Sequence, residues 1–165
     1  MPTARASRTI ALPVQELWEL VRDPHHLPRW WPRVTRVEDV ADGAFTEVMK
    51  TKKGKLVRAD FNVVRRDEAA HALRWEQRVA GTPFARVLAG AQTDVRLEPV
   101  QTGAGRAFAG GGASARAPGA GATRVTLELR QQLTGFFPRF GVYMVRRAAT
   151  ATLKDALDGL ERISG

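Results

Sequence analysis

Six successive segments with alternating apolar and polar residues constrain this chain more than any other feature. They lie at 34–40, 45–51, 56–66, 71–79, 84–100 and 123–133. Residues two apart share one face of a β-strand, so this period of two indicates half-buried strands. Together with an extended opening segment at 7–13, they predict an α+β fold built on a seven-stranded antiparallel meander.

Helical periodicity appears on both sides of these segments. Pro13 suits the first turn of a helix over the stretch PVQELWELVRD, and Asp23-Pro24 ends that helix because the residue before proline avoids the helical conformation. A very short helix follows at 25–30. The chain closes with a long amphipathic helix from about Pro138 to Ile163, whose apolar residues recur every three or four positions.

Length and composition narrow the classes of protein to which the chain can belong. Its 165 residues fit one domain, 1–165, and the absence of cysteine excludes disulfides and thiolate metal sites. The N-terminal stretch lacks the apolar core of a signal peptide, and no apolar run approaches the roughly 18 residues of a membrane span. We therefore expect a soluble, cytoplasmic protein.

The formal net charge of +9 comes from 26 Lys and Arg against 17 Asp and Glu. Such a charge raises nucleic acid or an anionic membrane as a partner. The arginines are scattered along the chain instead of forming one stripe, so the charge describes a surface and does not by itself indicate a function.

The stretch from Thr102 to Ala122 is rich in glycine and alanine and has almost nothing to bury. Its composition predicts a flexible hairpin insertion between the last two strands. A phosphate-binding glycine loop is disfavoured because no GK[ST] follows and because the segment joins two strands.

Several stretches carry a resemblance to a known superfamily. The opening ALPVQELWELVRDPHHLPRWWPRV resembles that of the polyketide cyclase/dehydrase and START-like superfamily (SRPBCC), and TDVRLEPV, TRVTLELR and ATLKDALDGLERI resemble its last strands and C-terminal helix. The resemblance implies a helix-grip fold, with a seven-stranded sheet wrapped around the C-terminal helix and two short helices after the first strand. It also implies an apolar cavity between sheet and helix. Lipid carriers, hormone receptors, cyclases and oxygenase domains share this fold, so the activity stays open.

The segment DPHHLPRWWPRV combines two histidines with two tryptophans. In a helix-grip fold it closes one end of the cavity, and we expect at least one of Trp30 and Trp31 to be core packing while the other touches a ligand. Adjacent helical residues point about 100° apart, so His25 and His26 do not form a metal site as an i, i+4 pair does. We expect no metal and no cofactor.

Inward-facing positions supply the candidate ligand site, although each of them could equally be ordinary core. Gln77, Thr93 and Gln131 stand out because a dry core rarely keeps polar groups without partners. Phe137 is a further candidate for the lining. The predicted ligand-binding residues are Trp30, Met49, Phe61, Trp75, Gln77, Val87, Thr93, Leu129, Gln131, Phe140, Tyr143 and Met144.

Catalysis has little support in the sequence. Tyr143, the only tyrosine, is a weak candidate for an acid or base, and a packed helix residue with a wet hydroxyl is the favoured interpretation. We expect a protein that binds or carries a small hydrophobic ligand, such as a lipid or a polyketide-like compound. The alternative is an aromatase/cyclase-type enzyme, a cyclase/dehydratase without metal, that uses the same cavity.

A cluster of lysines gives a second candidate surface. Lys50, Lys52, Lys53 and Lys55 lie in KTKKGKLVR, where a solvated hairpin is favoured over weak contact with an anionic membrane. Nucleic acid is not expected, because paired strand aromatics that stack exposed bases are missing. The ligand, the oligomeric state and the pathway stay open.

Overall fold

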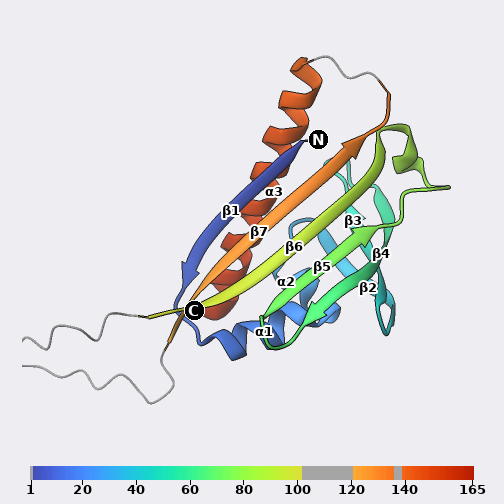
Figure 1. Cartoon of the computed structure of the whole chain (residues 1–165). Helices are drawn as coiled ribbons and strands as arrows, with labels where there is room; N and C mark the ends of the chain where they lie inside the picture. The colour runs from blue at the N-terminus through green and yellow to red at the C-terminus, as the bar shows by residue number, and fades with distance from the viewer. Residues whose placement is uncertain (1, 102–120, 136–138) are drawn as a thin grey trace, which may run out of the picture.

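The computed structural model describes residues 2–101, 121–135 and 139–165 and contains one seven-stranded antiparallel sheet (Figure 1). The strand order β1-β7-β6-β5-β4-β3-β2 makes a meander from β2 to β7, with β1 closing the free edge of β7. The strands are β1 (Thr3–Ile10), β2 (Val34–Ala41), β3 (Ala44–Lys50), β4 (Leu56–Asp67), β5 (Ala72–Gln77), β6 (Leu88–Val100) and β7 (Ala122–Leu133). The predicted α+β sheet topology is confirmed.

Three short helical segments connect β1 to β2 and close one end of the sheet: α1 (Val14–Arg22), η1 (Pro24–His26) and α2 (Leu27–Trp30). Asp23 ends α1 in an extended conformation and caps η1, since its Oδ1 accepts a hydrogen bond from the His25 amide at 3.0 Å. Leu27 and Trp30 are buried. The predicted helix break at Asp23-Pro24 is confirmed.

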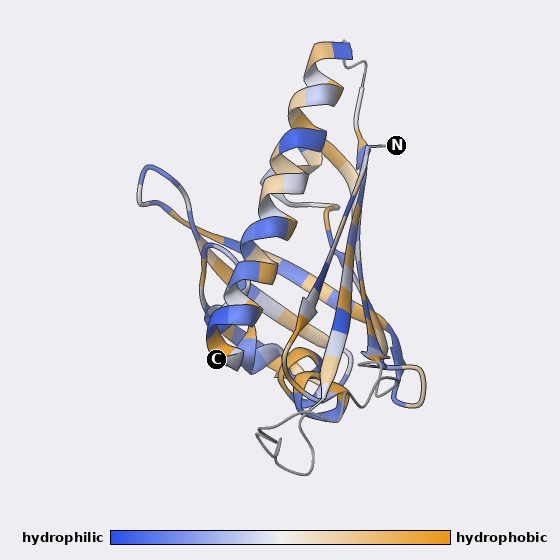
Figure 2. Cartoon of the chain, turned by 90° about the vertical axis from the view of Figure 1, so that its left-hand side faces the viewer, coloured by the Kyte–Doolittle hydropathy of each residue, from blue (hydrophilic) through white to orange (hydrophobic). Residues whose placement is uncertain are grey.

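The helix α3 (Arg139–Ser164) lies along one face of the sheet and contacts β1, β7 and α2 (Figure 1). Figure 2 shows bands of hydrophilic and hydrophobic residues along this helix, as its predicted apolar stripe requires. Its buried residues are Ala149, Leu153, Ala156, Leu157, Gly159 and Leu160. The small residues among them let the helix approach its neighbours closely.

The position of the first strand differs from the prediction. The sequence indicates an extended segment at 7–13, whereas β1 begins at Thr3 and pairs with β7 from Thr3↔Arg130 to Ile10↔Thr123. Its alternation of small and polar residues is too weak to recognise alone. Pairing along the whole edge of β7 determines how far β1 extends.

The start of β6 also differs. The prediction extends the strand back to Phe84, but Pro83–Arg86 forms a 3-10 turn (η2). A register shift between Leu88 and Gly90 then changes the alternation, so Leu88 is buried and Ala89 is exposed. The alternation predicted for the segment 84–100 is therefore broken at Leu88–Gly90 and is regular from Ala91 onward.

The predicted insertion at 102–122 lies mostly outside the described residues, which resume at Gly121. Its last residue, Ala122, belongs to β7.

Candidate ligand-binding cavity

Aromatic side chains gather on the inner face of the sheet, the face that α3 covers. Phe45 stacks on Phe61 with ring centroids 5.3 Å apart and meets Trp75 edge-on at 6.2 Å. Trp31 reaches over the sheet and contacts Trp75 edge-on at 5.7 Å. This aromatic cluster brings together two predicted ligand residues, Phe61 and Trp75.

Trp30 and Trp31 differ in burial, and the structure confirms core packing for one of the pair, Trp30, which the sequence also predicts to be a ligand-binding residue. Trp30 is 2% exposed and packs against Trp31 at 5.4 Å, so it belongs to the core at the closed end. Trp31 is half-buried and touches Trp75. Trp31 is thus the tryptophan that lies toward the inner face.

An apolar hollow of about 350 Å³ lies between the sheet and the first half of α3. Its size is at the lower end of the range of about 300–1,000 Å³ seen for small-molecule sites. Among the described residues that line it, only Gln131 and Thr152 are polar. The other lining residues are Val87, Leu88, Leu129, Leu133, Val145, Ala148 and Ala149.

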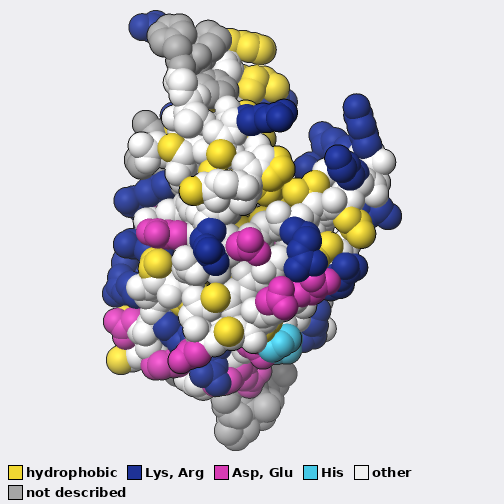
Figure 3. All heavy atoms as spheres, turned by 90° about the vertical axis from the view of Figure 1, so that its right-hand side faces the viewer, with side chains coloured by type: hydrophobic (Ala, Val, Ile, Leu, Met, Phe, Trp, Pro, Cys, Tyr) yellow, Lys and Arg dark blue, Asp and Glu magenta, His cyan; other side chains and the backbone are white. Residues whose placement is uncertain are grey.

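The molecular surface is hollowed in the space-filling view. Figure 3 shows a notch between the upper part of the molecule and an arm rich in Lys and Arg, with hydrophobic side chains along the notch. Exposed apolar side chains grouped along a hollow are typical of a binding surface.

A row of inward residues links the hollow to the aromatic cluster. Gln131 of β7 pairs with Ala91 of β6. The last β5–β6 pair is Glu76↔Gln92, so the next residue of β5, Gln77, lies beside Ala91. On the other side of β5, Gln77 pairs with Phe61 of β4. Two of the predicted inward polar residues, Gln77 and Gln131, therefore lie in one row across the sheet.

Glu47 is a buried carboxyl on this inner face, and the sequence-based prediction missed it. It is 1% exposed, with Phe45 and Met49 as its same-face neighbours along β3. Across the sheet it pairs with Val37 of β2 and Ala59 of β4. Glu47 lies at an inward position of the alternating strand, between the apolar residues Phe45 and Met49, and this alternation is the signal that could have identified it as buried.

The surroundings of Glu47 change its acidity. Burial alone raises the pKa of the Glu47 carboxyl from 4.5 to about 8, because the charged form loses its hydration. Its Oε1 has no hydrogen-bond partner among the described residues, and neither has Nε2 of Gln77. A buried polar atom without a partner costs free energy unless a water or a ligand satisfies it.

The remaining predicted site residues take different positions. Thr93 is 4% exposed and lies between Trp75 and Leu129 in the sheet register. Met49 is half-buried and packs against the core. The structure thus places both on the inner face.

The first turns of α3 carry three predicted residues whose side chains are exposed. Phe140, Tyr143 and Met144 are 72%, 58% and 46% exposed, and none of them lines the hollow. Val145, on the same stretch of helix, does line it. Phe137 lies outside the described residues.

The histidines take part in surface contacts at the closed end. His25 and His26 lie near Asp23, with His25 Nδ1 at 2.8 Å from Asp23 Oδ1. His71 meets Trp18 edge-on at 5.5 Å and lies 3.4 Å from Gln15 Oε1. Across the part of the chain that the structure describes, no group of three His, Asp or Glu side chains could hold a metal ion.

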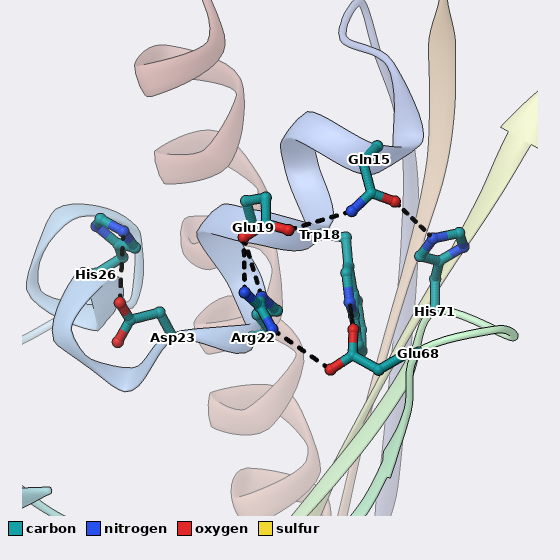
Figure 4. A network of polar contacts seen from close by, with 8 residues as sticks. All are labelled: Gln15, Trp18, Glu19, Arg22, Asp23, His26, Glu68 and His71. Carbon is teal, nitrogen blue, oxygen red and sulfur yellow. Dashed lines mark hydrogen bonds and ion pairs between the residues drawn. The ribbon is translucent and has the colours of Figure 1, made fainter.

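A polar network ties α1 to the β4–β5 turn (Figure 4). The indole N–H of Trp18 donates to Glu68, and Arg22 pairs with Glu19 at 2.9 Å and with Glu68 at 3.5 Å. These contacts hold the closed end of the fold together.

Charged residues line a groove of about 220 Å³ on the outer face of the sheet. Carboxylates neutralise its arginines in part, since Arg74 donates to Asp94 at 2.7 Å and Arg130 pairs with Glu128. Alternating charges of this kind are typical of a solvated sheet face.

The predicted basic segment forms the β3–β4 turn. Lys50, Lys52, Lys53 and Lys55 are exposed, and Gly54 adopts a φ of +80° that suits a tight turn. Among the described helices, none combines the length and the apolar character that crossing a membrane requires.

Comparison with known structures gives the same fold. The chain is 21% identical to the di-domain aromatase/cyclase BexL from the BE-7585A biosynthetic pathway (TM-score 0.74), covering 98% of this chain and 46% of BexL. A START superfamily protein from Mycobacterium smegmatis is 14% identical (TM-score 0.71), and the match covers 98% of this chain and 96% of that protein. A protein from Thermus thermophilus is 21% identical (TM-score 0.69), and the match covers 99% of this chain and 97% of that protein.

The chain therefore spans about half the length of BexL, and all of these similarities are similarities of fold. No curated protein matches the sequence. A family model described as "Polyketide cyclase / dehydrase and lipid transport" matches residues 1–165. The chain belongs to the polyketide cyclase/dehydrase and lipid transport family and has the START-like (SRPBCC) helix-grip fold.

Proposed function

We propose that this protein binds and carries a small hydrophobic molecule, such as a lipid or a polyketide-like compound, between its sheet and α3. The observation that carries the proposal is the apolar hollow of about 350 Å³ between the sheet and α3. The inward-facing row from Gln131 to Phe61 leads across the sheet from this hollow toward the aromatic cluster. Family membership supports a hydrophobic ligand.

Titration with an environment-sensitive apolar dye at low and high salt tests the proposal. Burial of apolar surface contributes roughly 25 cal/mol per Å² and depends little on salt, whereas contacts between charges weaken as salt rises. We expect salt-resistant binding that a Lys52/Lys53/Lys55→Ala variant leaves unchanged. Absence of dye binding at any salt concentration, or its loss in the lysine variant, contradicts the proposal.

A second candidate is an aromatase/cyclase-type reaction in the same cavity. Glu47 favours it, because a buried acid with a pKa near the working pH suits general acid–base catalysis. Cyclisation or dehydration of a polyketide-like substrate needs such a group beside the reacting carbonyl. Incubation with a linear polyketide mimic tests this function, and equal product formation by the wild type and by Glu47→Gln contradicts a role for this carboxyl.

We further propose that the β3–β4 turn makes weak contact with anionic membranes during ligand exchange. Three lysines, Lys52, Lys53 and Lys55, are exposed on this turn, and each basic residue near an anionic surface contributes roughly 1 kcal/mol. Co-flotation with phosphatidylserine vesicles should decrease when these lysines are changed to alanine. Equal flotation of both proteins contradicts the contact.

A further inference from the structure

We propose that Glu47 and Gln77 form a polar recognition site for a carbonyl oxygen at the buried end of a neutral, otherwise apolar ligand. The inference rests on the proposed function, because it specifies the class of ligand that the cavity accepts. It adds a direction to binding, with the oxygen-bearing end of the ligand toward β3–β5.

The placement of the two side chains is the first step. Both point to the inner face, with Glu47 on β3 and Gln77 on β5, and β4 lies between them. Strands lie about 4.8 Å apart, so the two backbones are separated by roughly 10 Å across the sheet. The two long side chains can therefore approach one ligand group from either side.

The residues of β4 between them differ in size. Glu47 pairs with Ala59, whose small side chain is the β4 neighbour on that row. Gln77 pairs with Phe61, which forms an aromatic wall on the adjacent row. Glu47 and Gln77 therefore lie on neighbouring rows, and an oxygen atom held over β4 between Ala59 and Phe61 would have the carboxyl on one side and the amide on the other.

The unsatisfied atoms define the chemistry of the ligand. Nε2 of Gln77 is a donor without a partner in the described chain, and Oε1 of Glu47 is a buried carboxyl oxygen without one. Because burial raises the pKa of Glu47 to about 8, the carboxyl carries its proton at neutral pH and also offers a donor. Two convergent donors require an acceptor, which a carbonyl oxygen with two lone pairs supplies.

A cationic ligand fits this site less well. An amine would need an ionised Glu47, whose burial disfavours charge, and the Gln77 N–H would face the cation. Trp30 Nε1 is also without a partner in the described chain, but Trp30 packs at the interface of α2 and α3 and is not included in the site.

A pair of matched probes tests the inference. 2-Acetylnaphthalene and 2-ethylnaphthalene have the same ring and differ by a carbonyl in place of a methylene. We expect the wild type to prefer the ketone by roughly tenfold in Kd, the effect of one to two hydrogen bonds. Glu47→Leu and Gln77→Leu should each reduce this preference, whereas Glu47→Gln, which keeps a donor, should retain most of it.

An infrared measurement reports the hydrogen bond directly. The ketone stretch should lie at lower frequency in the wild-type complex than in hexane, and the shift should disappear in the Glu47→Leu/Gln77→Leu double variant. Unchanged binding of 2-ethylnaphthalene by the variants shows that the cavity is intact.

The outcomes separate the two proposals. Equal affinity for both probes in the wild type, or a preference unchanged in Glu47→Leu, overturns the inference and leaves the apolar cavity standing. Preferential binding of 2-(aminomethyl)naphthalene that is lost in Glu47→Gln also overturns it, in favour of a cation site. Failure of every naphthalene probe to bind contradicts the proposed function, and the inference with it.

Discussion

Gly159 of α3 lies directly against the backbone of Trp30. A Cβ atom added at Gly159 would lie 2.3 Å from the Trp30 carbonyl oxygen and 2.8 Å from its Cα. The contact is to backbone atoms, which cannot rotate away. This glycine therefore sets how closely the C-terminal helix approaches the closed end of the cavity.

Gly159→Ala should destabilise the protein by about 1–3 kcal/mol, even though alanine is the better helix former. Chemical denaturation measures the loss. Gly165→Ala is the matched control, because the nearest atom to its added Cβ lies 3.7 Å away and no change is expected. Equal stability of Gly159→Ala and the wild type would show that the helix can shift without cost.

Glu47 should make the free energy of unfolding fall as pH rises. Its folded pKa of about 8 exceeds the ordinary value of 4.5, so between these values the unfolded chain releases a proton that the folded chain keeps. The stabilising contribution is full below pH 4.5 and is lost by about pH 8. The expected slope is about −1.4 kcal/mol per pH unit in this window.

Glu47→Gln should remove this slope, as urea unfolding at several pH values between 5 and 8 would measure. The neighbouring side chains across the sheet, Val37 and Ala59, do not titrate, and burial is the only cause of the shift. Glu76→Gln, at an exposed carboxyl of the outer face, is the control and should follow the wild type. Parallel curves for the wild type and Glu47→Gln would mean that the carboxyl is hydrated.

Binding of 2-acetylnaphthalene should weaken as pH rises through about 8, because the pKa of Glu47 is about 8 and an ionised carboxyl no longer donates to a carbonyl. The Kd of Glu47→Gln should stay constant over the same range, since an amide does not titrate there. A wild-type Kd that is independent of pH across this range would argue against donation by Glu47.

Filling the hollow should block the ligand. Ala148 lines the hollow and is exposed, so Ala148→Trp should raise the Kd for apolar dyes by roughly tenfold or more with little change in stability. Ala151→Trp is the matched control, on an exposed position of the same helix that does not line the hollow. Similar effects of both tryptophans would place the dye elsewhere.

The sequence predicts most of the fold because periodicity records which side of each strand is buried. Alternation identifies β2 to β5 and β7, and the stripe through Ala149, Leu153 and Leu160 identifies α3. The prediction from alternation fails where local structure interrupts the period of two, at the 3-10 turn before Leu88. It also fails at β1, where pairing with β7 decides the extent of the strand.

The site is less predictable than the fold. Glu47 occupies an inward position, but a charged residue is usually on the solvent side, so a prediction from residue type overlooks it. Tyr143 is a candidate because it is the only tyrosine, whereas the helix turns its neighbour Val145 toward the hollow. The rotation of α3 about its axis decides which residues of its first turns face the hollow. Tertiary packing sets this rotation, and the periodicity of the sequence does not reveal it at the end of an apolar stripe.

The location of a bound ligand tests the cavity most directly. Methyl-labelled protein titrated with 2-acetylnaphthalene should show saturable shifts of the Leu129, Leu133 and Val145 methyl signals, which line the hollow from β7 and α3. Intermolecular nuclear Overhauser effects should connect these methyl groups to the naphthalene ring. Saturable binding that leaves these methyl signals unchanged, with contacts confined to the outer face of the sheet, would contradict the account.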